Sequence, residues 1–375
     1  MDTQYNYDLF QQIYCLSFMA GFVGWKGSEE TLQNALKQTL EETLPHLTGN
    51  WAVSWGPRVY KVYYPDSEST PPDNTWFAAV DDIQKICVVA IAGTNIISLQ
   101  DLYQDFDVLE VVDFDAWVSQ WTAEDIPEPE DAFPIFDQPS TRAYCAKGTC
   151  SGVRNILNNT ETRYGDSIRI GQYLRSLDPT YTIVVTGHSL GGALAPIAAL
   201  GLVKAKLLGN HQSVKVVPSA GVSPGNELLA ASYSERFPVE TLGGKGYQVF
   251  NADYYNIYDI VPQAWSPDRN DDRNLHRILD EILHLSDDLR PLFDCIMRKV
   301  IGVSQLSQIK YSPLPGEPFD GPEPPSLIET PLEIIRVIIQ EHLDAYRDEI
   351  GITEFLDRFQ KSFLVRIGAQ GPSVT

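Results

Sequence analysis

Residues 181–195, YTIVVTGHSLGGALA, constrain the fold of this chain more than any other stretch. The β-branched apolar run from Ile183 to Val185 leads directly into G-x-S-x-G, and small residues typical of a buried helix follow. This order predicts a buried strand, a sharp turn and a helix, with Ser189 on the turn. A strained turn of this kind holds a serine hydroxyl in the open, where a base can take its proton.

The neighbours of Ser189 predict further parts of a catalytic turn. Gly187 and Gly191 leave room where any Cβ would meet the turn or the adjoining strand. The amide of Leu190, at the start of the helix, would point to where an oxyanion develops. G-x-S-x-G also occurs by chance, so the alternative is a Gly-rich connection without catalysis. The strand before it and the helix after it favour the catalytic interpretation.

The GHSLGGALA sequence and its flanking segments resemble the class 3 lipases, which are α/β-hydrolases that cleave acyl esters of lipids. The resemblance extends over residues 76–346. It implies the α/β-hydrolase fold, a mostly parallel central sheet with helices on both faces and a lid insertion. We expect a single domain over residues 1–375, with N-terminal helices at 1–48, the lid at 102–147, and a Pro-rich loop at 312–331 before the C-terminal helices.

The composition predicts a globular protein. Its hydrophobic content is 43%, no run approaches the roughly 18 apolar residues of a membrane span, and the start MDTQYNYDLF lacks the basic region of a signal peptide. We therefore expect no transmembrane segment, and either a cytoplasmic location or export by a non-classical route.

The charge and the cysteines exclude several classes of partner. A net charge of −22 repels phosphate backbones, so no nucleic acid is expected. The five cysteines show no metal-ligand spacing. Cys145 and Cys150 could close a short disulfide loop, but the lack of an export signal favours free thiols. We expect neither a metal nor another cofactor.

An acidic segment lies between Asn95 and Thr141, with twelve carboxylates and no lysine or arginine. The resemblance places the lid over the active site here, which would touch a lipid interface transiently. An acidic surface helix is the alternative. The apolar side chains expected on the lid's inner face are Val111, Val112, Phe114, Trp117 and Trp121.

The resemblance also implies the rest of the site. The strand ICVVAIAGTN, residues 86–95, ends in the Gly-Thr pair whose second member, Thr94, would be the other oxyanion donor beside Leu190. The acid follows the serine in the α/β-hydrolase order. N-x-x-D-x-V-P, residues 256–262, resembles the family's acid motif and points to Asp259, with Asp253 as the alternative.

The base is sought among the six histidines of the chain. His46, His188 and His211 precede the acid in the sequence. His276 and His284 lie in an amphipathic helical pattern typical of packing or surface residues. His342 lies in H-x-x-x-Y, which resembles the family's base-bearing stretch. The β-branched run at 332–339 before it is compatible with a strand or a helix.

These residues predict a serine carboxylic-ester hydrolase that acts on acyl esters of lipids through an acyl-enzyme, with Ser189, Asp259 and His342 as its triad. A phospholipase or a feruloyl-type esterase would share every motif. A hydrolase-like binding protein without catalysis is the alternative from another class.

Overall fold

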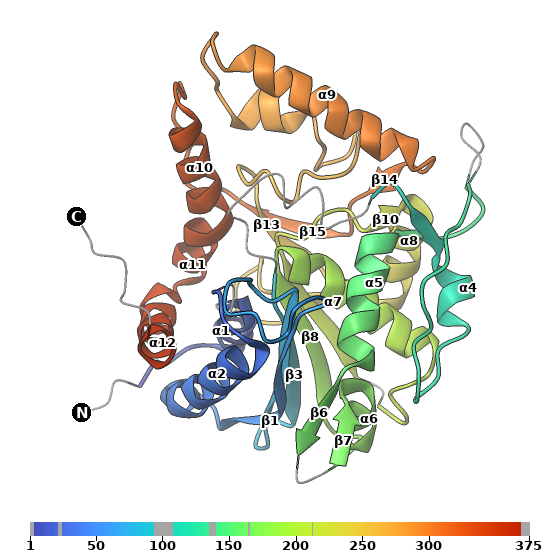
Figure 1. Ribbon diagram of the computed structural model, residues 1–375, viewed down its shortest axis with the longest axis vertical. Coiled ribbons are helices and arrows are strands. Elements are labelled where there is room, and N and C mark those ends of the chain that lie inside the picture. Colours follow the sequence, from blue (N-terminus) through green and yellow to red (C-terminus); the bar gives the residue numbers. More distant parts are fainter. Residues whose placement is uncertain are drawn as a thin grey trace.

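The main feature of the protein, seen in a computed structural model, is a seven-stranded sheet with helices on both faces (Figure 1). The structure describes residues 4–21, 25–93, 108–134, 140–163, 166–211 and 213–368. Five strands, β3, β8, β9, β13 and β15, run parallel, while β1 and β2 are antiparallel at one edge. The predicted α/β-hydrolase architecture with a mostly parallel sheet is therefore confirmed. In sheet order the strands are β1 Trp51–Tyr60, β2 Asn74–Asp81, β3 Ile86–Ile91, β8 Thr182–His188, β9 Val214–Ser219, β13 Asp253–Asn256 and β15 Gly316–Phe319.

Apolar side chains on both faces of the sheet explain why its central strands are continuous hydrophobic runs. Val88 and Val184 point into one core, and Val89 and Val185 point into the other. Because side chains alternate along a strand, each residue step changes the face. The two cores share one sheet, which supports the expected single domain over residues 1–375; that domain assignment stays a prediction.

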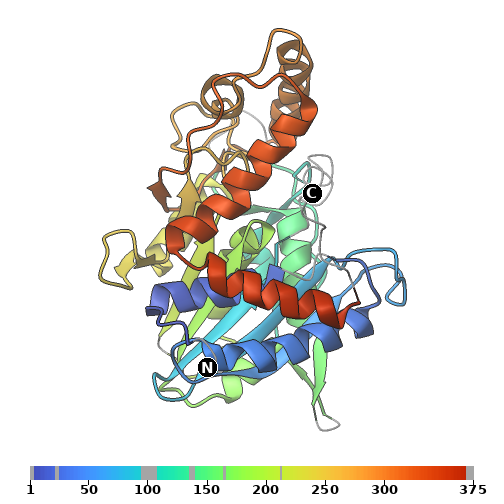
Figure 2. The ribbon, with the colours of Figure 1, turned by 90° about the vertical axis from the view of Figure 1, so that its left-hand side faces the viewer.

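One core lies under N- and C-terminal helices that are far apart in the sequence (Figure 2). These are α1 Leu9–Gly21, α2 Glu29–Thr43 and α12 Thr353–Arg366. Ser28 is the N-cap of α2, because its hydroxyl accepts a bond from the amide of Thr31 at 3.2 Å. The leucines of α2 at the expected helical spacing, Leu32, Leu36 and Leu40, are fully buried.

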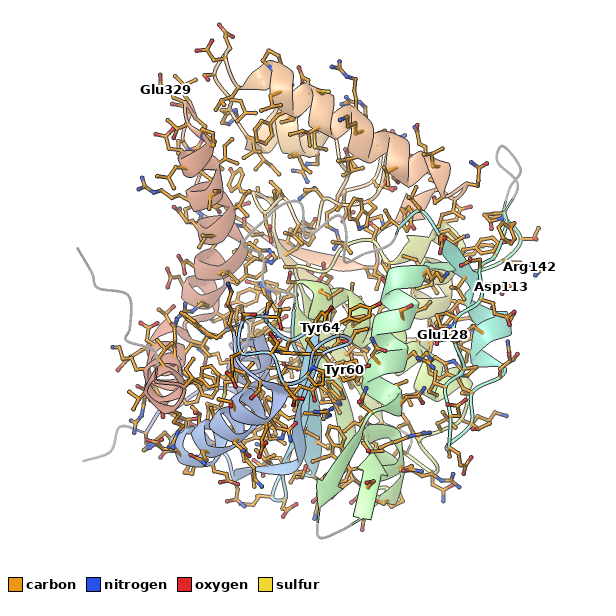
Figure 3. The ribbon with its side chains drawn as sticks, viewed as in Figure 1. Tyr60, Tyr64, Asp113, Glu128, Arg142 and Glu329 are labelled. Carbon is orange, nitrogen blue, oxygen red and sulfur yellow. The ribbon has the colours of Figure 1, made fainter. Side chains whose placement is uncertain are left out.

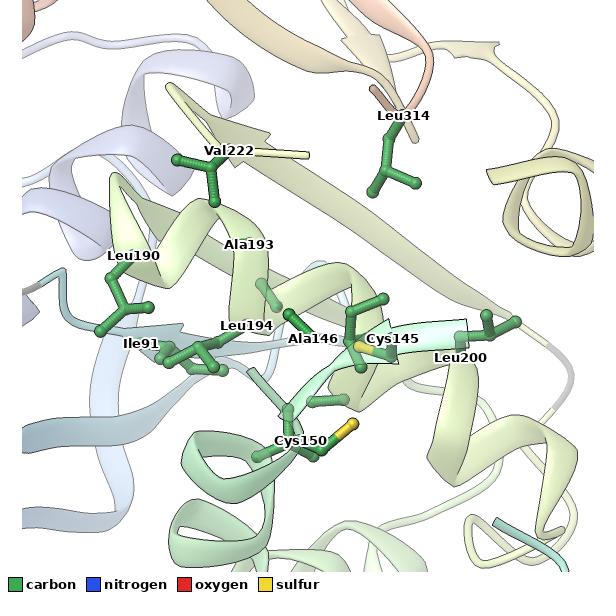
Figure 4. Packing of buried hydrophobic residues seen from close by; sticks show 14 of the residues in the cluster. Ile91, Cys145, Ala146, Cys150, Leu190, Ala193, Leu194, Leu200, Val222 and Leu314 are labelled. Carbon is green, nitrogen blue, oxygen red and sulfur yellow. The ribbon is translucent and has the colours of Figure 1, made fainter. Parts of the chain in front are cut away.

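The other core lies around α7, Leu190–Lys204, which packs against α5, Lys147–Asn158 (Figure 4). The two helices approach closely at Gly152, where a Cβ would lie 2.8 Å from Leu194 Cδ2. Cys145 and Cys150 are buried in this core as free thiols.

The described part of the predicted lid is built into the body of the protein. The strands β4 Val111–Asp113 and β5 Tyr144–Ala146 pair in a second sheet with β10 Gly225–Asn226 and β14 Tyr311–Ser312. Arg142 and Asp113 form an ion pair of 2.6 Å at its edge (Figure 3). The apolar residues expected on a lid's inner face are all buried in the core around α7: Val111, Val112, Phe114, Trp117 and Trp121. Residues 102–107 and 135–139 of the expected lid lie outside the described residues.

The C-terminal third includes the helices α9, Arg290–Leu306, and α10, which lie at the top of the view in Figure 1. The open question at 332–339 is answered by α10, Pro331–Ile339, which a capping box of Thr330 and Glu333 begins. The chain continues through a π-helical turn, η3 Gln340–Asp344, into α11, Ala345–Ile350. Among the described helices, none combines the length and the apolar character needed to cross a bilayer. The other elements are η1 Leu44–His46, α4 Phe114–Val118, β6 Thr160–Arg163, β7 Asp166–Arg169, α6 Ile170–Ser176, α8 Glu227–Arg236, β11 Glu240–Thr241, β12 Val249–Phe250, η2 Ile278–Ile282 and α9 Arg290–Leu306.

Candidate active site

Ser189 lies on the sharp turn between β8 and α7, as the sequence predicts. Its backbone angles, φ 62° and ψ −124°, are strained for a residue with a side chain. Gly187 and Gly191 permit this turn because neighbouring backbone atoms lie where a Cβ would be. A Cβ on Gly187 would lie 2.3 Å from the carbonyl oxygen of Gly191, and a Cβ on Gly191 would lie 2.2 Å from that of Ile91.

Leu190 begins α7 directly after the serine, so its amide lies at the positive end of the helix. Gly93, which the sequence analysis did not single out, lies against the same turn. A Cβ there would be 2.9 Å from Ser189 Cβ and 2.7 Å from the His188 carbonyl oxygen. The segment after β3 therefore reaches the elbow. Thr94, the predicted second oxyanion donor, lies outside the described residues.

Asp259 and His342 are brought together from positions 83 residues apart, with 2.7 Å between Asp259 Oδ2 and His342 Nδ1. Both side chains are buried. The other carboxylate oxygen, Oδ1, accepts a bond from the amide of Val261 at 2.9 Å. A carboxylate in this position holds Nδ1 protonated and leaves Nε2 free to accept a proton.

Tyr346 adds a second donor to the same carboxylate, because its hydroxyl lies 2.9 Å from Asp259 Oδ2. Burial, followed by the nearby Asp259, raises the pKa of Tyr346 well above its usual value. The phenol therefore keeps its proton and donates a hydrogen bond to Asp259, while its oxygen accepts a bond from the amide of Asn256 at 3.0 Å.

The alternative acid, Asp253, has a different set of contacts. Its Oδ2 pairs with Arg273, and its Oδ1 accepts a bond from the amide of Gly221 at 3.0 Å. Among contacts between described residues, His342 is the only histidine paired with a carboxylate. His276 instead contacts the Pro267 carbonyl oxygen through Nε2, at 3.2 Å.

Ser189 Oγ and His342 Nε2 are both buried, and neither has a hydrogen-bond partner among the described residues. Buried polar atoms usually have partners, so both atoms are candidates for a role in chemistry. These are the two atoms between which a serine hydrolase moves its proton. Over the described ranges, no group of three or more histidine, cysteine or acidic side chains is arranged to hold a metal ion.

His188, excluded as the base by its place in the sequence, directly precedes Ser189 in the elbow and contacts the turn that carries His342. Its Nε2 is 2.8 Å from the His342 carbonyl oxygen, and its Nδ1 is 3.0 Å from Ser219 Oγ. A carbonyl oxygen can only accept, so Nε2 carries the hydrogen. Burial, and secondly His342, lowers the pKa of His188 well below its usual value, so this ring is neutral.

Sequence reasoning missed the roles of Gly93, His188, Asn256 and Tyr346. Each stands inside a motif that was used to find another residue, since Asn256 opens N-x-x-D-x-V-P and Tyr346 closes H-x-x-x-Y. Their places within these motifs were the signal in the sequence that could have pointed to them.

Comparisons with known proteins show what this chain is similar to. Residues 88–268, which include Ser189 and Asp259 but not His342, match the family model "Lipase (class 3)". Over this range the chain is similar to the class 3 lipases. Among curated proteins, "Putative lipase LIH1" of Saccharomyces cerevisiae is 29% identical over 126 residues, which are 34% of this chain and 34% of that protein. The match thus spans about a third of the length of this curated relative.

A solved structure, described as the crystal structure of M37 lipase, is similar over nearly the whole of this chain. Its TM-score is 0.67 at 22% identity, with 96% of this chain and 98% of that chain covered. At this identity the likeness shows the fold alone. The coverage extends past residue 268, so the C-terminal helices belong to the shared architecture.

Proposed function

We propose that this chain is a serine carboxylic-ester hydrolase that cleaves acyl esters of lipids through an acyl-enzyme. The lipase family supports ester hydrolysis. The observation that carries the mechanism is the pair of unpartnered buried atoms, Ser189 Oγ and His342 Nε2, together with the bond from His342 Nδ1 to Asp259.

In this mechanism His342 Nε2 takes the proton of Ser189 while Ser189 Oγ attacks the ester carbonyl carbon. Asp259 stabilises the imidazolium that forms. The amides of Leu190 and Thr94 are proposed to bind the oxyanion. Collapse expels the alcohol, which takes its proton from His342. Water then attacks the acyl carbon, with His342 again as the base. The bond between that carbon and Ser189 Oγ breaks, His342 returns the proton to Oγ, and the acid product leaves.

The substrate is proposed to be a lipid ester presented at an interface. Transient contact through residues 102–147 remains part of this proposal. The apolar side chains expected on the lid's inner face are buried, whereas Leu109 and Phe133 are exposed. The contact would therefore fall to Leu109 and Phe133, or would require the segment to open. A phospholipase or a feruloyl-type esterase would use the same triad on another substrate.

The test is hydrolysis of p-nitrophenyl butyrate, a triacylglycerol emulsion and phosphatidylcholine vesicles by wild type and Ser189→Ala. We expect Ser189→Ala to lose at least about 10⁴-fold in turnover with unchanged melting. Ser17→Ala is the matched control, because Ser17 is also buried with an unpartnered Oγ among the described residues. No turnover of any ester by wild type would favour a hydrolase-like binding protein instead.

A further inference from the structure

We propose that His188 and Asn256 are positioning residues, which hold the proposed base by hydrogen bonds to the main chain of the turn that carries it. The inference rests on the proposed role of His342. It concerns two side chains that make no contact with the Asp259 carboxylate in the structure.

Two consecutive carbonyl oxygens of η3 accept bonds from side chains of the central sheet. His188 Nε2 lies 2.8 Å from the His342 carbonyl oxygen, and Asn256 Nδ2 lies 3.0 Å from that of Glu341. Carbonyls inside a helix ordinarily accept from amides of their own helix. In the π-helical turn that carries the base, side-chain donors from β8 and β13 are added, so the turn is tied to the strand of the nucleophile and to the strand before the acid.

The His188 ring is fixed on all sides. It stacks on Phe18 with 4.6 Å between ring centroids, lies 4.7 Å from the His342 ring, and meets Tyr346 edge-on at 5.0 Å. Because this ring is neutral, it adds no positive charge beside His342 when His342 becomes an imidazolium. Its function is therefore to donate one bond in a fixed direction.

The Asn256 amide is fixed as firmly. Its Oδ1 accepts from the amides of Tyr258 at 3.0 Å and Gly321 at 3.1 Å, which orients Nδ2 toward Glu341. Gly321 leaves just enough room, since a Cβ there would be 2.4 Å from Nδ2. Nδ2 also reaches Glu341 Oε2 at 2.8 Å. An aspartate would keep the shape of Asn256 and lose both donated bonds.

Loss of either donor should let η3 shift relative to Ser189. A misplacement of about 1 Å at a reacting group costs on the order of 100-fold in rate. The expected loss is in kcat, with KM little changed, because neither side chain is proposed to touch the substrate.

The decisive comparison is His188→Gln against His188→Leu. Glutamine can place an N–H near the position of Nε2, whereas leucine fills the space without a donor. We expect a loss of about threefold in kcat for His188→Gln and about 100-fold for His188→Leu and for Asn256→Asp. His276→Leu is the matched control, because His276 also contacts a main-chain carbonyl oxygen through Nε2, at Pro267.

A second readout does not require activity: the low-field proton resonance of His342 Nδ1–H, bonded to Asp259. It should persist in His188→Gln and His276→Leu and be lost or broadened in His188→Leu. Wild-type kcat and an unchanged resonance in His188→Leu would overturn the inference, as would equal losses in the glutamine and leucine variants. If Ser189→Ala retained activity, the proposed function would fail while the resonance still reported how the turn is held.

Discussion

Ser189 and His342 occupy two regions that the fold builds in different ways. The elbow is local, since the strand, the turn and the close glycine contacts lie mostly within residues 187–192, with Ile91 and Gly93 from the adjoining strand and its end. The base turn, which is η3 with the proposed base His342, depends on distant partners. Asp259 is 83 positions away along the chain and His188 is 154 away.

The difference shows how each region can fail. Backbone sterics fix the elbow, so a small added group there should damage the fold itself. Directed hydrogen bonds fix the base turn, so removing one donor or acceptor should leave a folded protein that reacts slowly.

The largest expected effects, on turnover and on stability, should come from substituting Asp259 and Asp253. Asp259→Asn would leave His342 in the wrong tautomer, and we expect about 10⁴-fold lower kcat with the fold intact. Asp253→Asn would instead leave the buried Arg273 with only the Asp272 carboxylate, 3.7 Å away, and we expect a loss of about 3 kcal/mol in unfolding free energy. Kinetics on a soluble ester and urea unfolding of both variants are the measurements. Loss of turnover in a stable Asp253→Asn would mean that the acid has been misassigned.

The next effect concerns the elbow. In Gly191→Ala the new Cβ would lie 2.2 Å from the Ile91 carbonyl oxygen, and we expect a loss of more than about 3 kcal/mol in unfolding free energy. Gly302→Ala is the control, because its site in α9 has nothing within 4 Å and alanine favours helix there by up to about 1 kcal/mol. Similar stability of the two variants would show that the elbow is not fixed by sterics.

The smallest expected effect is a change in stability at Glu341, the residue directly before His342. Burial is the main cause that raises its pKa to about 7, from 4.5. The folded state then binds a proton more tightly than the unfolded chain, so stability falls as the pH rises from about 4.5 to 7 and the full cost is present above pH 7. Glu341→Gln should therefore raise stability by about 1–3 kcal/mol at pH 8 and by almost nothing at pH 4.

Thermal melting at both pH values checks this, with the exposed Glu349→Gln as the control. Glutamine can still accept the bond from Asn256 Nδ2, so kcat should change little. Equal melting shifts at pH 4 and pH 8 would contradict the raised pKa of Glu341.

The sequence was most informative where structure is local. The buried strand before Ser189 and the helix after it follow from periodicity and turn chemistry, and the structure contains both. It was less informative for the acidic segment. Val111, Trp117 and Trp121 alternate with carboxylates as they would on an amphipathic lid, yet they are buried against helices from later in the chain.

The site shows the same division. The elbow followed from the spacing around Ser189, whereas Asp259 and His342 came from the family resemblance, and the structure brings these two side chains together. The contacts of His188 and Asn256 with the base turn could not be read from the sequence, because they depend on which carbonyls the folded turn presents to the sheet.

The most direct test is covalent labelling with a p-nitrophenyl alkylphosphonate, which traps an activated serine. We predict about one equivalent of p-nitrophenol released per protein chain, with the adduct on Ser189 by peptide mass mapping. Labelling should be absent in Ser189→Ala and slowed by at least about 100-fold in His342→Ala. An adduct on another residue, or unchanged labelling in His342→Ala, would contradict the proposed pairing of Ser189 and His342.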